Sequence, residues 1–111
     1  MSAFEDIAIR AADLDALIAE AVKPVVVEFW APWCGMCRLM APSLMKLKAE
    51  LGGAVEVVAL NVEDAQAAAA ARNVLSLPTI LAFQGGKEVK RIKGMISYAN
   101  LLAETRALTV Q

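Results

Sequence analysis

The sequence of 111 residues predicts an α/β fold, in which a central mixed sheet of five strands carries helices on both faces. Short β-branched segments alternate along the chain with segments that show the 3.6-residue periodicity of a helix. The pair Gly85-Gly86, between the last two β-rich segments, is typical of a hairpin turn. No linker, internal repeat or low-complexity tail divides the chain, so we expect a single domain over residues 1–111.

The first half of the chain contains two strand–helix units. Residues 4–10 alternate weakly and are expected to form a short strand, which is followed by helical spacing of apolar residues over 13–22. The segment 25–30, Val-Val-Val-Glu-Phe-Trp, is continuously β-branched and aromatic, as in a strand buried on both faces. A short loop then leads into a long helical pattern over 34–51.

The second half adds three strands and two helices. We expect a strand at 55–62, an alanine-rich helix at 64–72, a hairpin of strands 79–84 and 88–92, and a last helix at 97–108 capped by Ser97. Right-handed crossovers make the first three strands parallel. The hairpin is expected to add two strands antiparallel to them.

Composition excludes several classes of protein. The formal net charge of −1 argues against a nucleic-acid or acidic-membrane partner held by bulk electrostatics. No apolar run approaches the roughly 18 residues of a membrane-spanning helix. The acidic N-terminus shows no basic region followed by an apolar one, so we expect no signal peptide.

The chain contains no histidine and only two cysteines. The absence of histidine excludes Ser-His and Cys-His nucleophilic sites as well as histidine metal ligands. Two cysteines are too few for the disulfide framework of a small secreted protein. Their spacing, Cys34-Gly35-Met36-Cys37, is therefore the informative feature.

The predicted site of this cysteine pair favours redox chemistry. Cys34 comes where a buried strand gives way to a helix, so its thiolate faces free backbone N–H groups and the positive end of the helix dipole. Both effects stabilise the thiolate as a nucleophile. Cys37 follows one helical turn later, within reach of Cys34, and is placed to attack a mixed disulfide.

Other interpretations of the pair remain open on the spacing alone. A structural disulfide closing so short a loop removes only about 2 kcal/mol of unfolded-state entropy. A zinc site needs two further ligands, which the chain lacks unless a second molecule supplies them. The thioether of Met36 beside two thiolates also suits Cu(I).

The sequence context resembles the thioredoxin family. The stretch 25–37, Val-Val-Val-Glu-Phe-Trp-Ala-Pro-Trp-Cys-Gly-Met-Cys, is followed in order by Ala41-Pro42, Leu77-Pro78-Thr79 and Gly85-Gly86, which are similar to that family's signature segments. The resemblance covers nearly the whole chain. It implies the thioredoxin fold and a cytoplasmic dithiol reductant of protein disulfides. It also implies that the protein binds no cofactor or metal and receives electrons from NADPH through a thioredoxin reductase. We expect a monomer.

The resemblance also assigns roles. Cys34 matches the family's nucleophile, Cys37 its resolving thiol, and Pro78 a cis-proline whose preceding backbone pairs with an extended substrate. The remaining residues expected to contact substrate are Trp33, Gly35, Met36, Leu77, Gly94 and Met95. Leu75 and Met40 add to an apolar surface that favours extended apolar partners, although a core role for some of these methionines is an equal alternative.

Three positions depart from the family pattern. Met36 replaces the usual proline between the cysteines, which is expected to shift the redox potential in a direction the sequence leaves open. Glu28 stands in the place of the family's buried acid, where desolvation would raise its pKa and suit it to exchange protons with Cys37. The alternative is a carboxylate that bends out to solvent. Ala59 replaces the lysine commonly found beside that acid.

The leading hypothesis is a protein-disulfide reductase. A thiol oxidase or isomerase is the enzymatic alternative, since a more stable thiolate makes the pair oxidising. A non-enzymatic thioredoxin-like interaction module is a second alternative, and it would keep its function after Cys34→Ser. A metal carrier is the third.

Overall fold

A computed structural model describes residues 4–109 around a mixed sheet of four strands in the order β2-β1-β3-β4. Its strands are β1 (Val25–Trp30), β2 (Glu56–Asn61), β3 (Thr79–Gln84) and β4 (Lys87–Lys93). β1 and β2 are parallel, β3 is antiparallel to β1, and β4 is antiparallel to β3. β4 therefore runs in the direction of β1. The expectation that both hairpin strands oppose the parallel ones was wrong for β4.

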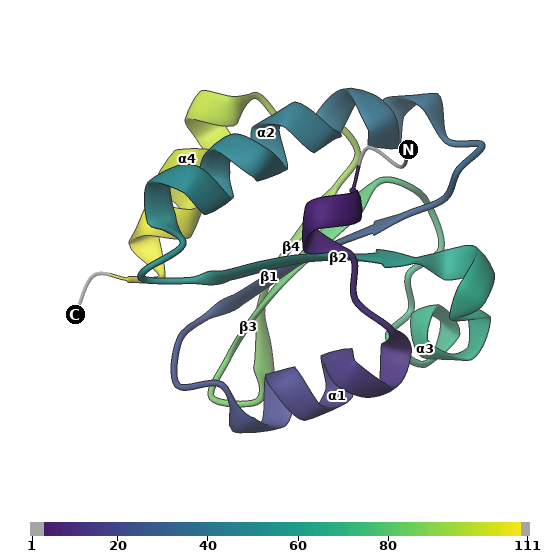
Figure 1. The fold of residues 1–111 in the computed structure, drawn as a ribbon, viewed down its shortest axis with the longest axis horizontal. Helices are drawn as coiled ribbons and strands as arrows, with labels where there is room; N and C mark the ends of the chain where they lie inside the picture. Colours follow the sequence, from purple (N-terminus) through teal and green to yellow (C-terminus); the bar gives the residue numbers. More distant parts are fainter. Residues whose placement is uncertain (1–3, 110–111) are drawn as a thin grey trace.

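Helices cover both faces of the sheet, which confirms the predicted α/β layering. In Figure 1, α2 and α4 lie over one face of the sheet and α1 and α3 lie over the other. None of these helices, within the residues that the structure describes, is long and apolar enough to cross a membrane. The helices are α1 (Ala11–Glu20), α2 (Gly35–Leu51), α3 (Gln66–Ala71) and α4 (Tyr98–Ala107), with 3-10 turns η1 (Glu5–Ile7) and η2 (Val62–Asp64).

The central strand β1 is buried along its whole length and divides the core into two clusters. Side chains alternate across a strand, so successive residues of β1 face opposite helix layers. Val26 and Trp30 belong to the cluster under α2 and α4, whereas Val27 and Phe29 belong to the cluster over α1 and α3. The same alternation places the intervening residue, Glu28, on the face covered by α2 and α4.

The predicted fifth strand, at residues 4–10, does not form. Glu5–Ile7 is a 3-10 turn closed by a hydrogen bond from the Ile7 N–H to the Phe4 carbonyl at 3.0 Å, and only Ala8 makes an isolated parallel bridge, to Ala59. Phe4 and Ile7 are both buried in the cluster under α2. Residues three apart lie on the same side of a 3-10 turn, whereas strand alternation would send them to opposite faces.

Local signals set several element ends as predicted. The Ser97 hydroxyl caps α4 by accepting a hydrogen bond from the Asn100 N–H at 3.2 Å. Gly85 and Gly86 both have positive φ, of 62° and 81°, as a two-residue hairpin turn requires. The alanine-rich segment is shorter than predicted, because Ala65 leaves helical geometry between η2 and α3, at φ −150°.

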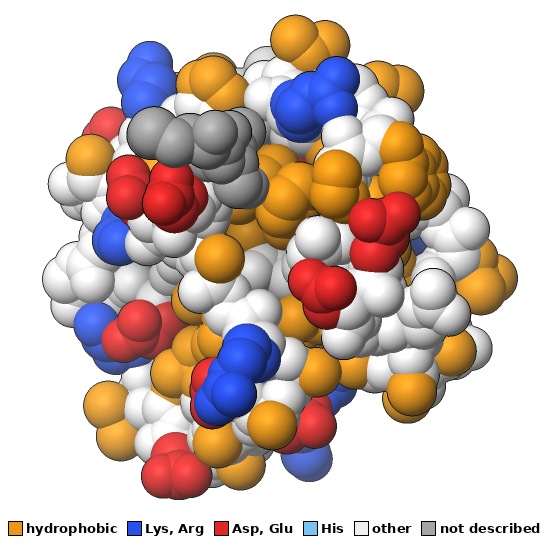
Figure 2. All heavy atoms as spheres, turned by 45° about the vertical axis from the view of Figure 1, so that its right-hand side comes forward, with side chains coloured by type: hydrophobic (Ala, Val, Ile, Leu, Met, Phe, Trp, Pro, Cys, Tyr) orange, Lys and Arg blue, Asp and Glu red, His pale blue; other side chains and the backbone are white. Residues whose placement is uncertain are grey.

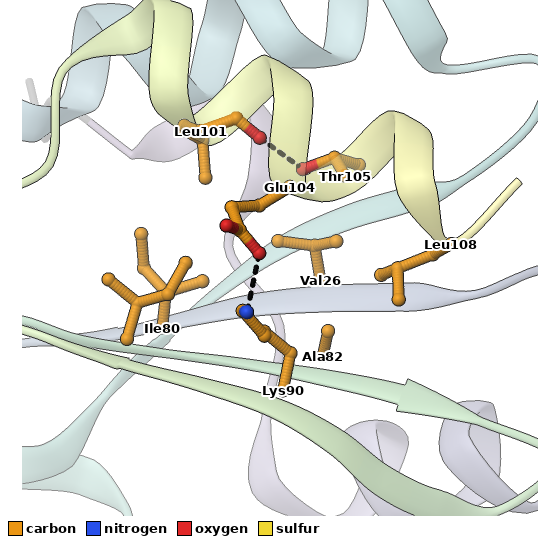
Figure 3. A pocket seen from close by; sticks show the side chains of 9 residues that line it. Val26, Ile80, Ala82, Lys90, Leu101, Glu104, Thr105 and Leu108 are labelled. Carbon is orange, nitrogen blue, oxygen red and sulfur yellow. Dashed lines mark hydrogen bonds and ion pairs between the residues drawn. The ribbon is translucent and has the colours of Figure 1, made fainter.

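A small packing gap remains between α4 and the sheet (Figure 3). Its volume is about 10 Å³, which leaves room for one water at most. Leu101 and Thr105 of α4 face Val26 and Ile80 of the sheet around this gap. An ion pair between Lys90 of β4 and Glu104 of α4 spans its edge, so α4 is tied to the sheet by both packing and charge.

Candidate active site

The two cysteines lie at the junction between β1 and α2. β1 ends at Trp30, and after a short loop Cys34 occupies the N-cap position of α2 with extended backbone angles, φ −90° and ψ 101°. The Cys34 sulfur accepts a hydrogen bond from the Cys37 N–H at 3.2 Å. That N–H is one of the unsatisfied donors at the helix start, so the site stabilises negative charge on Cys34 sulfur. The predicted placement of the pair is confirmed.

Cys34 and Cys37 are joined in a disulfide, with their Cα atoms 5.3 Å apart. The two residues differ in accessibility: Cys34 retains 8% of its surface, whereas Cys37 is completely buried. Both belong to the cluster of buried residues under α2. An incoming partner therefore meets Cys34 first, while Cys37 is shielded behind it.

Pro78 and Gly94 lie beside each other although they are far apart in sequence. The Leu77–Pro78 peptide bond is cis, as the resemblance implied. The Gly94 N–H donates a hydrogen bond to the Pro78 carbonyl at 2.8 Å, which links the start of β3 to the segment after β4. Leu77 packs against the buried cluster that contains both cysteines. The fold thus gathers these predicted site residues at one end of the sheet.

Several predicted contact residues form an exposed apolar surface. Trp33 is 67% exposed, and Met36 and Met95 are each 47% exposed. Gly35 is also exposed at the first position of α2. Met40, by contrast, is buried, so it belongs to the core and not to this surface.

Gly94 has a backbone conformation that favours glycine, with φ +82°. A Cβ at this position would meet no atom within 4 Å, so the cost of a side chain is conformational and not steric. We expect Gly94→Ala to lower the free energy of unfolding by about 1–2 kcal/mol. Urea unfolding monitored by circular dichroism measures this change.

Gly35→Ala is the matched control, because Gly35 lies in the first turn of α2 and a Cβ there also meets no atom within 4 Å. Its backbone is helical, so alanine is expected to leave stability unchanged or to raise it by less than about 1 kcal/mol. Equal effects of the two substitutions would show that the backbone conformation of Gly94 carries no cost.

Glu28 is completely buried in the middle of β1. Neither carboxylate oxygen has a hydrogen-bond partner among the described residues. Desolvation raises the pKa of Glu28 from its ordinary 4.5 to about 8. Of the two sequence interpretations, the buried acid is the one that the structure shows, and the carboxyl group is neutral at neutral pH.

Ala59 lies directly opposite Glu28 in the parallel register of β1 and β2. On the other side of β1, the residue opposite Glu28 is Ile80 of β3. Both cross-strand neighbours are apolar and buried, so neither offers Glu28 a counter-charge or a hydrogen bond. The sequence prediction that Ala59 leaves the acid without its usual basic neighbour is therefore confirmed.

Three further residues of this end of the molecule were not singled out from the sequence. Leu39 of α2 is 70% exposed. Val62 and Glu63 line a groove beside Trp33 and Leu77. Leu39 carried a signal, since it falls outside the stripe of Met40, Leu44 and Leu47 that α2 buries. Val62 and Glu63 carried none, because only tertiary packing brings η2 beside the loop before Cys34.

Comparisons with known proteins agree with this geometry. The family model described as Thioredoxin matches residues 6–107. A thioredoxin of Streptomyces clavuligerus is 47% identical over 88 residues, which are 79% of this chain and 81% of the relative. A thioredoxin of Haemophilus influenzae is 38% identical over 93 residues, 84% of this chain and 87% of the relative.

Two other matches bear on fold and partners. A bifunctional thioredoxin reductase/thioredoxin of Mycobacterium leprae is 43% identical over 82 residues, 74% of this chain but 18% of that protein. The crystal structure of mitochondrial thioredoxin 3 from Saccharomyces cerevisiae, in its oxidized form, superposes with a TM-score of 0.84 at 26% identity. That superposition covers 96% of this chain and 100% of the yeast chain.

Proposed function

Since the chain belongs to the thioredoxin family and is a thiol–disulfide oxidoreductase with a Cys-x-x-Cys redox pair, we propose that Cys34 is its nucleophile and Cys37 its resolving thiol. The observation that carries this assignment is the difference in exposure, 8% for Cys34 against 0% for Cys37. Only the outer sulfur is open to a substrate disulfide. The N-cap position of Cys34 also favours its thiolate over that of Cys37.

The proposed reaction is a pair of thiol–disulfide exchanges. The Cys34 thiolate attacks one sulfur of the substrate disulfide, which forms a mixed disulfide and releases the other substrate sulfur as a thiolate. The Cys37 thiolate then attacks the Cys34 sulfur and releases the second substrate thiolate. Two electrons have passed to the substrate, and the protein is left with the Cys34–Cys37 disulfide that the structure shows.

We propose that Glu28 exchanges a proton with Cys37 during the second step. Cys37 must lose its proton before it attacks, and it is buried where bulk water does not reach it. Glu28 is the buried acid on the face of the sheet that α2 covers, in the same layer as Cys37. A pKa of about 8 lets its carboxyl group both accept and return a proton near neutral pH.

Substrate binding is assigned to the exposed surface around Cys34. An extended segment of the partner protein is expected to pair with the backbone before Pro78 and to lie across the apolar surface. The hydrogen bond from the Gly94 N–H to the Pro78 carbonyl ties this segment to the one after β4. The proposed contact residues are Trp33, Gly35, Met36, Leu77, Pro78, Gly94 and Met95.

The reduced dithiol has to be regenerated, and we propose that a thioredoxin reductase supplies electrons from NADPH. The Mycobacterium leprae relative, whose name joins the two activities in one chain, supports this partner. The chain itself is proposed to bind no cofactor and to act as a monomer formed by a single domain. We also propose a cytoplasmic location, where thiols stay reduced and a Cys-x-x-Cys pair is kept ready to act.

One assay tests this function. Given NADPH and a bacterial thioredoxin reductase, the protein is expected to reduce insulin, which is measured as NADPH consumption and as turbidity from the released chains. Reactions without the reductase, or without this protein, should stay at the background rate. A folded protein that dithiothreitol reduces but that neither accepts electrons from the reductase nor reduces insulin would contradict the proposal.

A further inference from the structure

A groove runs from the loop before Cys34 towards α3. It has a volume of about 390 Å³, and its floor and walls are mostly apolar. The residues that line it include Trp33, which directly precedes Cys34, together with Leu77, Leu75 and Ala70. Alanine side chains on α3 leave this space open, since larger residues at the same positions would fill it.

Glu63 is the one charged residue among those that line this groove. The Glu63 N–H donates to the Asn61 side chain at 3.0 Å, so the backbone of the turn is held in place. Its carboxylate makes no hydrogen bond or ion pair with the rest of the described chain, residues 4–109. Six other acids of the same range are engaged in ion pairs, namely Asp13, Asp15, Glu50, Glu56, Glu88 and Glu104.

The surface of the molecule places acidic and hydrophobic side chains next to each other. Figure 2 shows the side of the molecule that brings the right-hand part of Figure 1 forward, and acidic side chains lie there directly beside a group of hydrophobic ones. A mostly apolar groove with a single acidic residue among those that line it fits a long side chain with an aliphatic stem and a cationic head. Lysine and arginine bind surfaces in this way, with the stem buried and the charge towards the rim.

We propose that this groove binds a Lys or Arg side chain of the partner protein and that Glu63 makes the protein prefer disulfides with a basic residue nearby. The inference rests on the proposed function, because the partner segment is the one whose disulfide Cys34 attacks. Trp33 directly precedes Cys34 and lines the groove, so the two sites are contiguous. Side chains on the same side of an extended segment are two residues apart, about 6.5–7 Å. We therefore propose two positions from the attacked cysteine as the place of the basic residue.

The test compares peptide disulfides that differ at one position, two residues before or two residues after the target cysteine. That position carries Lys, Glu, Met or Gly. For the native protein, kcat/KM is expected to be about fivefold higher with Lys than with Glu in at least one of the two registers, as for an exposed charge pair. The ratio is expected to fall towards one as salt screens the charges.

Variants of Glu63 separate this effect from general electrostatics. Glu63→Gln is expected to remove the preference, and Glu63→Lys to reverse it in favour of Glu peptides. Asp64→Asn and Asp64→Lys are the matched controls, since Asp64 is the adjacent exposed acid and lines a different hollow. Equal effects at the two positions would mean that net charge and not the groove sets the preference.

A second pair of variants tests the apolar floor. Ala70→Leu is expected to lower kcat/KM about threefold for Lys and Met peptides while leaving the Gly peptide unchanged. Ala67→Leu changes an exposed residue of the same helix and is expected to leave kcat/KM unchanged for all of these peptides. Equal rates for all four peptides in both registers would overturn the groove assignment alone. Failure to reduce any peptide, the Gly peptide included, would overturn the proposed function itself.

Discussion

Replacing Cys34 by serine is expected to abolish disulfide reduction, with a loss of more than about a thousandfold in kcat/KM, while the fold remains intact. A serine hydroxyl stays protonated at neutral pH and does not attack disulfides. Cys37, the remaining thiol, is completely buried and cannot reach a partner in its place. The insulin and peptide assays measure the loss, and circular dichroism verifies the fold.

Cys37→Ser is the informative counterpart of this variant. Cys34 remains exposed at the helix start and still attacks the substrate, but no second thiol releases the mixed disulfide. The variant is expected to accumulate a covalent complex with its substrate, visible by mass spectrometry without reductant. A mixed disulfide trapped through Cys37 in the Cys34→Ser variant, with none formed by Cys37→Ser, would reverse the two assigned roles.

Function that persists in both variants would instead support the interaction module that the sequence left open. Such a module needs the surface around Trp33 but not the sulfur chemistry. A partner captured equally by the native protein and by Cys34→Ser, with no change in its disulfides, would be its signature.

Replacing Glu28 by glutamine is expected to change the pH dependence of turnover. The native carboxyl group has a pKa of about 8, so it becomes able to accept the Cys37 proton as the pH rises towards that value. The amide accepts no proton at any pH. We therefore expect Glu28→Gln to slow turnover about tenfold above neutral pH and less below it. Superimposable pH profiles would remove Glu28 from the mechanism.

The same group makes stability depend on pH. In the unfolded chain the carboxyl ionises near 4.5, whereas in the folded chain it keeps its proton up to about pH 8. The folded state thus binds more protons in this window, and stability falls as the pH rises through it. The slope is at most about 1.4 kcal/mol per pH unit. Glu28→Gln should lack this slope in urea unfolding, and a slope that persists would show that another group causes it.

Ala59→Lys tests why the pKa of Glu28 is so high. Ala59 is fully buried opposite Glu28 in the strand pair, so an ammonium group at this position lies near the carboxyl. An adjacent positive charge favours the ionised carboxylate, so the pH profile should move to lower pH. Ala59→Met occupies similar space without charge and should leave the profile in place. Equal pH profiles for the two variants would show that the added volume, and not the added charge, changes the pKa of Glu28.

The sequence by itself determined most of the local structure and the nature of the site. A continuous β-branched and aromatic run predicted β1, apolar residues at helical spacing predicted α2, and the Gly85-Gly86 pair predicted the hairpin. The Cys34–Cys37 spacing at the strand-to-helix junction, in a chain without histidine, made thiol redox chemistry the leading hypothesis. Ser97 and the Gly85-Gly86 pair act through their own backbone neighbours, so the helix cap and the turn could be predicted from the local sequence.

Only the tertiary structure decided the features that depend on distant partners. The burial of Glu28 follows from register, which sets Ala59 and Ile80 on either side of it. The N-terminal segment became a turn because Phe4 and Ile7 bury in the same cluster, a requirement set by α2 and not by the segment. Glu63 joins Trp33 in one groove only when η2 packs beside the active-site loop. Local sequence patterns indicate which secondary structure each segment can form. Burial, pKa and the binding surface depend instead on residues that are distant in sequence and that the fold brings together.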